Sequence, residues 1–111
     1  MHIVFPSEKL QKLFNSSRDL ARKYGPENAR KLRSRLDDLK AARSLEEMRD
    51  LPSRTHELHG DRAGTFALVL SKGWRLIFEP AENPLPRKPD GGLEWSRIDS
   101  IRILNVEDYH D

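Results

Sequence analysis

The spacing of the apolar residues changes once along this chain, and that change limits the possible folds more than any other feature. In the first half, apolar residues recur at three- and four-residue steps, at Leu10, Leu13, Phe14, Leu20, Ala21 and Tyr24. From about residue 63 they alternate instead, as on a strand with one buried face. Helices followed by a meander of strands predict an α+β domain with the N-terminal helices packed on one face of a small, curved antiparallel sheet.

The helical half contains start and stop signals at the expected places. Ser7 predicts the N-cap of one helix of about four to five turns, which ends at Gly25. A second helix is expected from Pro26 onward, antiparallel to the first, and its inward-facing residues are Ala29, Leu32, Leu36 and Leu39. Residues 44–47 (Ser-Leu-Glu-Glu) predict a capping box that starts a further short helical turn.

The remaining segments predict strands and one long loop. Strands are expected at residues 2–5, 65–70, 74–78 and 95–104. The last of them carries Ile98, Ile101 and Ile103 toward the core. Residues 80–94 hold four of the seven prolines, which predicts a long, exposed and mobile hairpin loop.

Composition narrows the functional class. A chain of 111 residues predicts one domain, residues 1–111, and the absence of cysteine excludes disulfides, thiolate nucleophiles and cysteine-based zinc sites. The longest apolar run, residues 66–70, is too short to cross a bilayer, and we expect a soluble cytoplasmic protein. The first 62 residues carry 14 Lys and Arg against 10 Asp and Glu, whereas the other 49 carry 6 against 8. This asymmetry fits either a polyanion-binding surface or ordinary solvated helix faces.

Titratable side chains gather in residues 54–62 and 108–111, which hold three of the four histidines. Three interpretations remain open from the residues alone. His56 and His59 could bind a metal with Asp61 or His110, although His-x-x-His is common by chance. The same groups could catalyse metal-free acid–base cleavage of RNA. In the third interpretation, the histidines only cap turns and the C-terminal residues are a polar tail.

Three segments, taken in order, resemble the HigB-type toxins of the RelE/ParE superfamily. They are Leu-His-Gly-Asp-Arg-Ala-Gly at 58–64, Trp-Arg-Leu-Ile-Phe at 74–78, and Ile-Leu-Asn-Val-Glu-Asp-Tyr-His at 103–110. The Leu-x-x-Leu-Phe step at 10–14 also fits the family, so the resemblance covers nearly the whole chain. Each segment alone is a weak signal, but three in this order are fairly specific.

The resemblance implies a microbial-RNase-like fold and a ribosome-dependent mRNA endonuclease, the toxin of a type II toxin–antitoxin system with a role in plasmid maintenance and growth regulation. Carried over by position, it implies His56, Asp108, Tyr109 and His110 as catalytic residues. For such a reaction His59, Arg62 and Arg75 are the candidates for binding the RNA phosphates. No metal or other cofactor is implied, because the 2′-hydroxyl of the substrate is the nucleophile.

The implied partners are mRNA on the ribosome and a helix-turn-helix antitoxin of the HigA type, with operator DNA contacted only through the antitoxin and no membrane. The alternative is a non-catalytic toxin-like protein, either a ParE-like gyrase inhibitor or an antitoxin-binding co-repressor. Two features depart from the family pattern. His59 stands where relatives often have lysine, and the Pro-rich loop at 80–94 is unusual.

Overall fold

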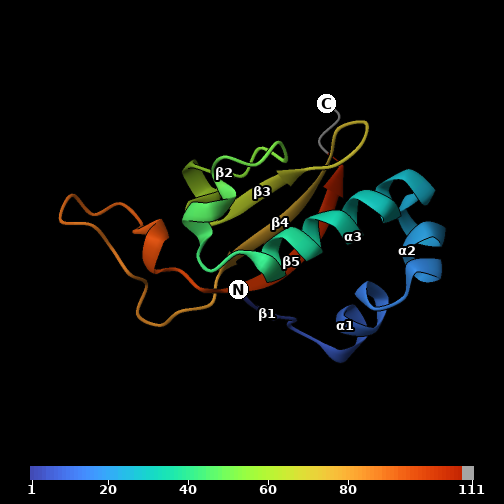
Figure 1. Ribbon diagram of the computed structural model, residues 1–111, viewed down its shortest axis with the longest axis horizontal. Helices are drawn as coiled ribbons and strands as arrows, with labels where there is room; N and C mark the ends of the chain where they lie inside the picture. The colour runs from blue at the N-terminus through green and yellow to red at the C-terminus, as the bar shows by residue number, and fades with distance from the viewer. Residues whose placement is uncertain (109–111) are drawn as a thin grey trace.

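The computed structural model describes residues 1–108 of the chain, and within them three α-helices pack on one five-stranded sheet (Figure 1). The elements follow in the order β1 (His2–Val4), α1 (Glu8–Phe14), α2 (Ser17–Tyr24), α3 (Pro26–Ala41), β2 (His56–Glu57), β3 (Phe66–Val69), β4 (Trp74–Pro80) and β5 (Ser100–Asp108). Three short 3₁₀ helices lie between them, at Leu45–Met48 (η1), Gly60–Arg62 (η2) and Trp95–Arg97 (η3). The α+β class is therefore confirmed.

The sheet has the strand order β1-β5-β4-β3-β2 and is mixed rather than purely antiparallel. β1 runs parallel to β5, with His2 opposite Ser100, while the other neighbouring pairs are antiparallel. The prediction of an antiparallel sheet was wrong for β1, because short strands far apart in sequence carry no signal of their relative direction. At a register shift between Ile77 and Phe78, one residue of β5 has no partner on β4.

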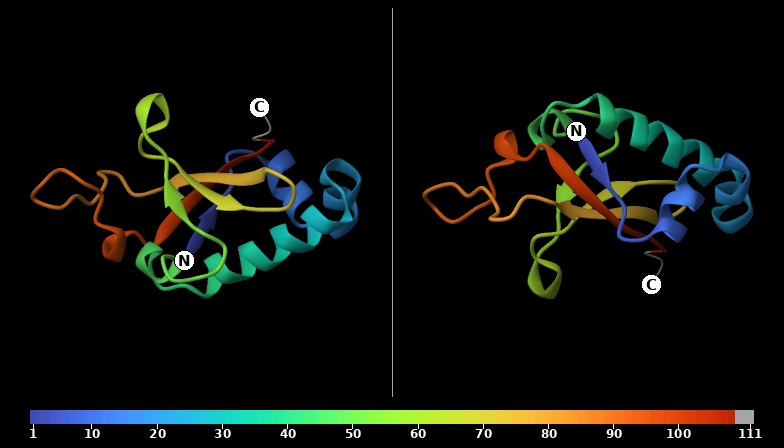
Figure 2. Two further views of the ribbon diagram at one scale, coloured as in Figure 1. Left: turned by 90° about the horizontal axis from the view of Figure 1, so that it is seen from above. Right: turned by 90° about the horizontal axis from the view of Figure 1, so that it is seen from below.

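The core lies between the helices and one face of the sheet. The predicted helical positions Leu32, Leu36 and Leu39 are buried against strand residues that include Phe78 and Ile103. The predicted core residues Ile98, Ile101 and Ile103 are fully buried as well. Figure 2 shows α3 on one side of the sheet and the loop between β2 and β3 rising from the other side. One face of the sheet is thus left uncovered by helices.

The predicted single N-terminal helix is in fact two helices. The break falls at Asn15 and Ser16, where the backbone N–H of Asn15 still bonds to the carbonyl oxygen of Gln11 at 3.0 Å and that of Ser16 bonds to Leu13 at 3.1 Å. The hydroxyl of Ser16 then accepts a hydrogen bond from the backbone N–H of Asp19, at 3.1 Å, and begins α2. The side chains of Asn and Ser compete for backbone hydrogen bonds and favour helix caps. The helix therefore ends here, although the apolar period continues through this point.

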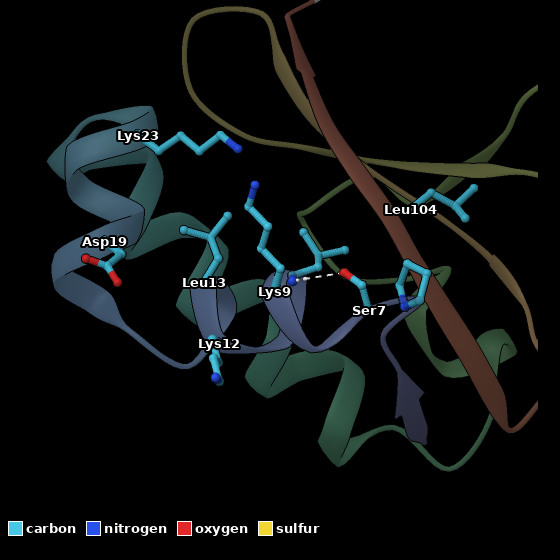
Figure 3. Close-up of a pocket in the computed structure, with 9 residues that line it drawn as sticks. Ser7, Lys9, Lys12, Leu13, Asp19, Lys23 and Leu104 are labelled. Atoms are coloured by element: carbon cyan, nitrogen blue, oxygen red, sulfur yellow. Dashed lines mark hydrogen bonds between the residues drawn. The ribbon is translucent and has the colours of Figure 1, made fainter.

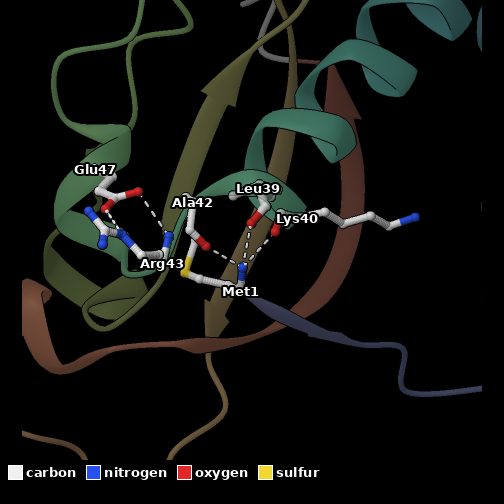
Figure 4. Close-up of polar contacts among 6 residues, drawn as sticks. All are labelled: Met1, Leu39, Lys40, Ala42, Arg43 and Glu47. Atoms are coloured by element: carbon white, nitrogen blue, oxygen red, sulfur yellow. Dashed lines mark hydrogen bonds and ion pairs between the residues drawn. The ribbon is translucent and has the colours of Figure 1, made fainter.

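The segment after α3 departs from the predicted capping box. Its helical turn is the 3₁₀ helix η1, and the carboxylate of Glu47 accepts the backbone N–H of Arg43 at 2.9 Å rather than that of Ser44. The side chain of Arg43 donates a second hydrogen bond to Glu47, at 3.0 Å (Figure 4). These contacts with Arg43 lower the pKa of Glu47.

The α-amino group of Met1 lies at the C-terminal end of α3 (Figure 4). It donates to the carbonyl oxygens of Leu39 at 2.9 Å, Lys40 at 3.0 Å, and Ala42. These carbonyls end the helix, and a positive group there is favourable because the C-terminal end of a helix carries partial negative charge. The contacts fix the start of β1 against α3.

The C-terminal half forms largely where predicted, with two corrections. β5 begins at Ser100 and runs to Asp108, so the predicted strand at 95–104 started too early, because Trp95–Arg97 is the 3₁₀ helix η3. The two-residue edge strand β2 lies in a segment predicted as a loop. No helix of the described residues is long and apolar enough to span a membrane.

Residues 81–94 form an arm that extends from the sheet between β4 and η3 (Figure 1). At its tip the backbone N–H of Lys88 bonds to the oxygen of Gly92 at 2.7 Å, and Arg87 pairs with Leu93 as a β-bridge. At its base, Leu93 and Trp95 are buried. The predicted hairpin loop is thus closed by its own hydrogen bonds and anchored in the core.

Candidate functional site

A cluster of polar side chains lies on the sheet face that the helices leave uncovered. Side chains alternate between the two faces of a strand, so Arg75 on β4 and Glu107 on β5, which are opposite each other in register, point away from the core residues Leu76 and Val106. Arg62 reaches the same place from η2, in the loop that rises from this face in Figure 2.

Arg62 and Glu107 form a two-pronged ion pair. The guanidinium Nη1 and Nη2 atoms of Arg62 lie 2.8 and 2.7 Å from the two carboxylate oxygens of Glu107. The side-chain amide of Asn105 donates to one of those oxygens at 2.9 Å. The side chains of Arg62 and Glu107 are 36% and 28% exposed, so a ligand in solution can reach the pair.

This geometry sets the charge state of the carboxylate. The hydrogen bond from Arg62, followed by that from Asn105, outweighs partial burial and lowers the pKa of Glu107. Glu107 is therefore an anion at neutral pH and a poor proton acceptor while the pair is intact. An incoming phosphate, also an anion with oxygen acceptors, competes with Glu107 for the donors of Arg62.

Asn105 and Glu107 were not singled out from the sequence as site residues. The signal that could have found them is the alternation along β5, in which Val106 packs against the core and its two neighbours face the other way. The register shift hides this alternation in the sequence. Because β5 has one residue without a partner on β4, the core positions Ile103 and Val106 are three residues apart rather than two.

The structure brings only some of the predicted site residues together. Arg62 lies beside Glu107, and Arg75 lies opposite it and donates a hydrogen bond to the carbonyl oxygen of Trp74 at 3.1 Å. Asp108 is exposed and opposite Trp74, so alternation places it on the other face from Glu107. Tyr109 and His110 lie outside the described residues.

His56 lies apart from this cluster. It is on β2, in register with Ala67 of β3, and Ala67 is in turn in line with Ile77 and Asn105. Three steps between neighbouring strands separate His56 from Asn105 by about 14 Å. The exposed ring of His56 instead lies with Nδ1 3.1 Å from the carbonyl oxygen of Arg54.

His56 and His59 line a cleft of about 420 Å³ at the base of the arm. The other lining residues are Arg49, Thr55, Glu57, Lys88, Gly92, Leu93 and Trp95. The guanidinium carbon of Arg49 lies 3.7 Å from the centre of the Trp95 ring. The predicted RNA-binding residue His59 is therefore grouped with basic side chains that the sequence did not connect to it.

A second, larger hollow of about 590 Å³ lies between α1, α2 and β5. Its walls include the apolar side chains Leu10, Leu13 and Leu104. Figure 3 shows Lys9 and Lys23 extending from the two helices toward the same space, whereas Lys12 and Asp19, which also line the hollow, lie farther from β5. We call this feature the α1–α2 groove.

The donor chemistry of the described residues does not support the metal interpretation. Within residues 1–108, no three His, Asp or Glu side chains converge as potential metal ligands. His56 and His59 face a cleft in which Glu57 is the acidic lining residue, and the remaining polar groups there are cations or a hydroxyl. A typical metal site needs three or four ligands at one point.

Comparison with known proteins identifies the fold. No protein-family model matches the chain, and no curated protein sequence matches it. Among solved structures, a YoeB/ParE toxin from Agrobacterium tumefaciens is similar over 100% of both chains, with a TM-score of 0.55 and 12% sequence identity. The three helices on a five-stranded mixed sheet are therefore a toxin fold of the RelE/YoeB type.

Proposed function

We propose that the chain is the toxin of a type II toxin–antitoxin pair, and that it cuts mRNA on the ribosome. The observation that carries this proposal is the Arg62–Glu107–Asn105 cluster, which stands with Arg75 on the uncovered sheet face of a toxin-type fold. The HigB-type resemblance of the three sequence segments supports the same activity. It also supports assignment to the HigB branch.

The proposed reaction needs no nucleophile from the protein. The ribose 2′-oxygen attacks the adjacent phosphorus, a base takes its proton, and the 5′-oxygen leaves with a proton from an acid, which produces a 2′,3′-cyclic phosphate. Arg62 and Arg75 bind the phosphate and stabilise the charge that develops on it. The resemblance gives the proton transfers to Asp108, Tyr109 and His110. Since Asp108 lies on the other face of β5 from Glu107, we assign the transfers to Tyr109 and His110.

Glu107 has a different role in this proposal. Its lowered pKa makes it a poor base, but it fixes both ends of the Arg62 guanidinium in the absence of RNA. When a phosphate takes over these donors, the freed carboxylate regains basicity close to the 2′-hydroxyl. Glu107 thereby holds Arg62 in position before binding and becomes a candidate proton acceptor afterwards.

His56 does not act on the same phosphate in this proposal. It lies about 14 Å from Asn105, on the far side of β3 and β4 from β5, whereas a proton-transfer group must lie within hydrogen-bonding distance of the reacting atom. We assign His56 and His59 to substrate binding. No metal or other cofactor is proposed, because the substrate supplies the nucleophile and the side chains supply the charge.

The expected partner is a helix-turn-helix antitoxin, and the α1–α2 groove is the surface we propose for its docking. The groove has an apolar lining of Leu10, Leu13 and Leu104, and three lysines against one aspartate on its walls. This combination suits an acidic segment with apolar side chains on one face. The groove also favours the second candidate function, a partner-binding protein without catalysis.

The test is primer extension on a reporter mRNA translated in vitro with the wild-type protein and His110→Ala. We expect cuts within translated codons that need ribosomes, and a rate about 10²–10⁴-fold lower for the variant, as for loss of a general acid or base. Arg97→Ala, an exposed position on η3 that lines neither hollow, is the matched control and should cut normally. Intact mRNA with the wild-type protein would favour the partner-binding alternative.

A further inference from the structure

The cleft at the base of the arm contains a preorganised arginine. The Nε and Nη2 atoms of Arg49 each lie 3.1 Å from a carboxylate oxygen of Glu46, so one edge of the guanidinium is fixed. One of its faces is held against the indole of Trp95, with 3.7 Å between the guanidinium carbon and the ring centre. Trp95 is itself buried and packs edge-on against Phe66, with ring centres 5.1 Å apart.

This arrangement leaves a flat cationic surface available. Arg49 is exposed, its second face is turned away from Trp95, and its Nη1 donors are not used by Glu46. Guanidinium planes that stack on one aromatic ring are platforms on which an unpaired nucleic-acid base can stack in turn. The exposed cation Lys88, from the arm, lines the same cleft.

A second observation at the bottom of the cleft also indicates a polar ligand. Thr55 is 8% exposed and lines the cleft, and its hydroxyl oxygen has no hydrogen-bond partner among the described residues. A buried hydroxyl without a partner is unfavourable, and a polar ligand atom removes this cost when a small shift of the cleft lining uncovers the oxygen, which the surrounding atoms cover. The volume of about 420 Å³ lies in the range of small-molecule sites, large enough for one nucleotide and too small for a folded helix.

We propose that this cleft binds one nucleotide of the RNA strand, with its base stacked on Arg49 and its phosphate near Lys88 and His59. The inference rests on the proposed mRNA cleavage and names a second contact with the same substrate. The cleft adjoins the Arg62–Glu107 pair, because the carbonyl oxygen of its lining residue His59 accepts a hydrogen bond from the backbone N–H of Arg62 at 3.3 Å. One RNA strand can therefore contact both the pair and the cleft.

The proposal assigns a task to the Pro-rich arm, which the resemblance to HigB-type toxins does not explain. The arm supplies Lys88, Gly92 and Leu93 to the cleft and leads directly into Trp95. Because its tip is closed by hydrogen bonds between Lys88 and Gly92 and between Gly91 and Lys88, the arm presents these groups without a large ordering cost on binding.

The test uses the full chain and a single-stranded RNA tetranucleotide carrying 2′-O-methyl groups, which cannot be cleaved. Binding is followed by NMR through the indole N–H signal of Trp95, assigned with Trp95→Phe. We expect this signal to move on titration, and Arg49→Lys, which keeps the charge but loses the plane, to weaken binding about 10-fold. Lys88→Gln should weaken it about threefold, as for one exposed phosphate contact.

Arg97→Lys is the matched control, since Arg97 is an exposed arginine on the neighbouring helix η3 and does not line the cleft. Unchanged affinity in both Arg49→Lys and Lys88→Gln, or a Trp95 signal that does not move while the RNA binds, overturns the proposal. A tetraglutamate peptide that displaces the RNA at equal concentration overturns the assignment to a nucleotide. If the wild-type protein does not cut mRNA, by contrast, the proposed function is wrong. The oligonucleotide titration still tests binding at the cleft in that case, because it does not depend on cleavage.

Discussion

Two arginines, Arg62 beside β5 and Arg49 in the cleft at the base of the arm, are fixed in different ways, and the difference indicates different tasks. Arg62 is fixed by a two-pronged ion pair with Glu107, a carboxylate at the place where a phosphate is proposed to bind. Arg49 is fixed by Glu46 at one edge and by the ring of Trp95 on one face, and its other face stays available. A ligand must displace Glu107 to use Arg62, whereas it can add to Arg49 without displacing anything. We therefore expect Arg62 to act in the reaction and Arg49 in binding.

The largest expected effect concerns the support of the Arg49 platform. Trp95 is 8% exposed and packs against Phe66, so Trp95→Ala removes a large buried ring and should lower the free energy of unfolding by about 3–5 kcal/mol. Urea denaturation followed by circular dichroism measures this. Arg49→Lys, which leaves the ring in place, is the control and should cost less than about 1 kcal/mol. A loss below 1 kcal/mol in Trp95→Ala would show that the arm is not anchored as described.

The next effect concerns the reaction. Arg62→Lys keeps a cation but loses the forked geometry, and we expect the rate of mRNA cleavage to fall about 10-fold or more at saturating protein. Cleavage at single turnover on stalled ribosome complexes measures this rate. Arg35→Lys is a poor control because Arg35 bonds to the backbone of Val69, so the exposed Arg97→Lys serves instead. A normal rate in Arg62→Lys would remove Arg62 from the mechanism.

The smallest effect is on stability and depends on pH. The pKa of Glu107 in the folded protein lies below its ordinary value of 4.5, so its ion pair contributes stability above that pH and loses the contribution as the pH falls through the lowered folded value. Since the pair is about one-third exposed, Glu107→Gln should cost at most about 1 kcal/mol at pH 7 and less at pH 3. Thermal unfolding of both proteins at the two pH values tests this, and an equal cost at both would contradict the charged pair.

The sequence predicted the layers of this fold because long apolar patterns carry strong signals. The stripe through Leu32, Leu36 and Leu39 and the alternation around Phe78 needed no tertiary information. The break at Asn15–Ser16 was missed, since a cap within a continuous apolar period is a local competition that the period does not record. The parallel pairing of β1 was missed because only contact with β5 determines it.

The candidate site was predicted in part for related reasons. The motifs selected Arg62 and Arg75, which the structure places on the same sheet face as Glu107, but they also gave His56 a catalytic role, although three strand steps separate it from β5. Glu107 and Arg49 were missed because each depends on a partner that is far away in the sequence. The partner of Glu107 is Arg62, and that of Arg49 is Trp95. Tyr109 and His110 remain predictions.

The measurement that tests the division of labour most directly is single-turnover mRNA cleavage on ribosome complexes as a function of protein concentration. The account predicts that Arg62→Lys lowers the maximal rate, while Arg49→Lys raises the concentration needed for half of that rate and leaves the maximum unchanged. If both variants change the same quantity, or if the wild-type protein does not cut at any concentration, the account is contradicted.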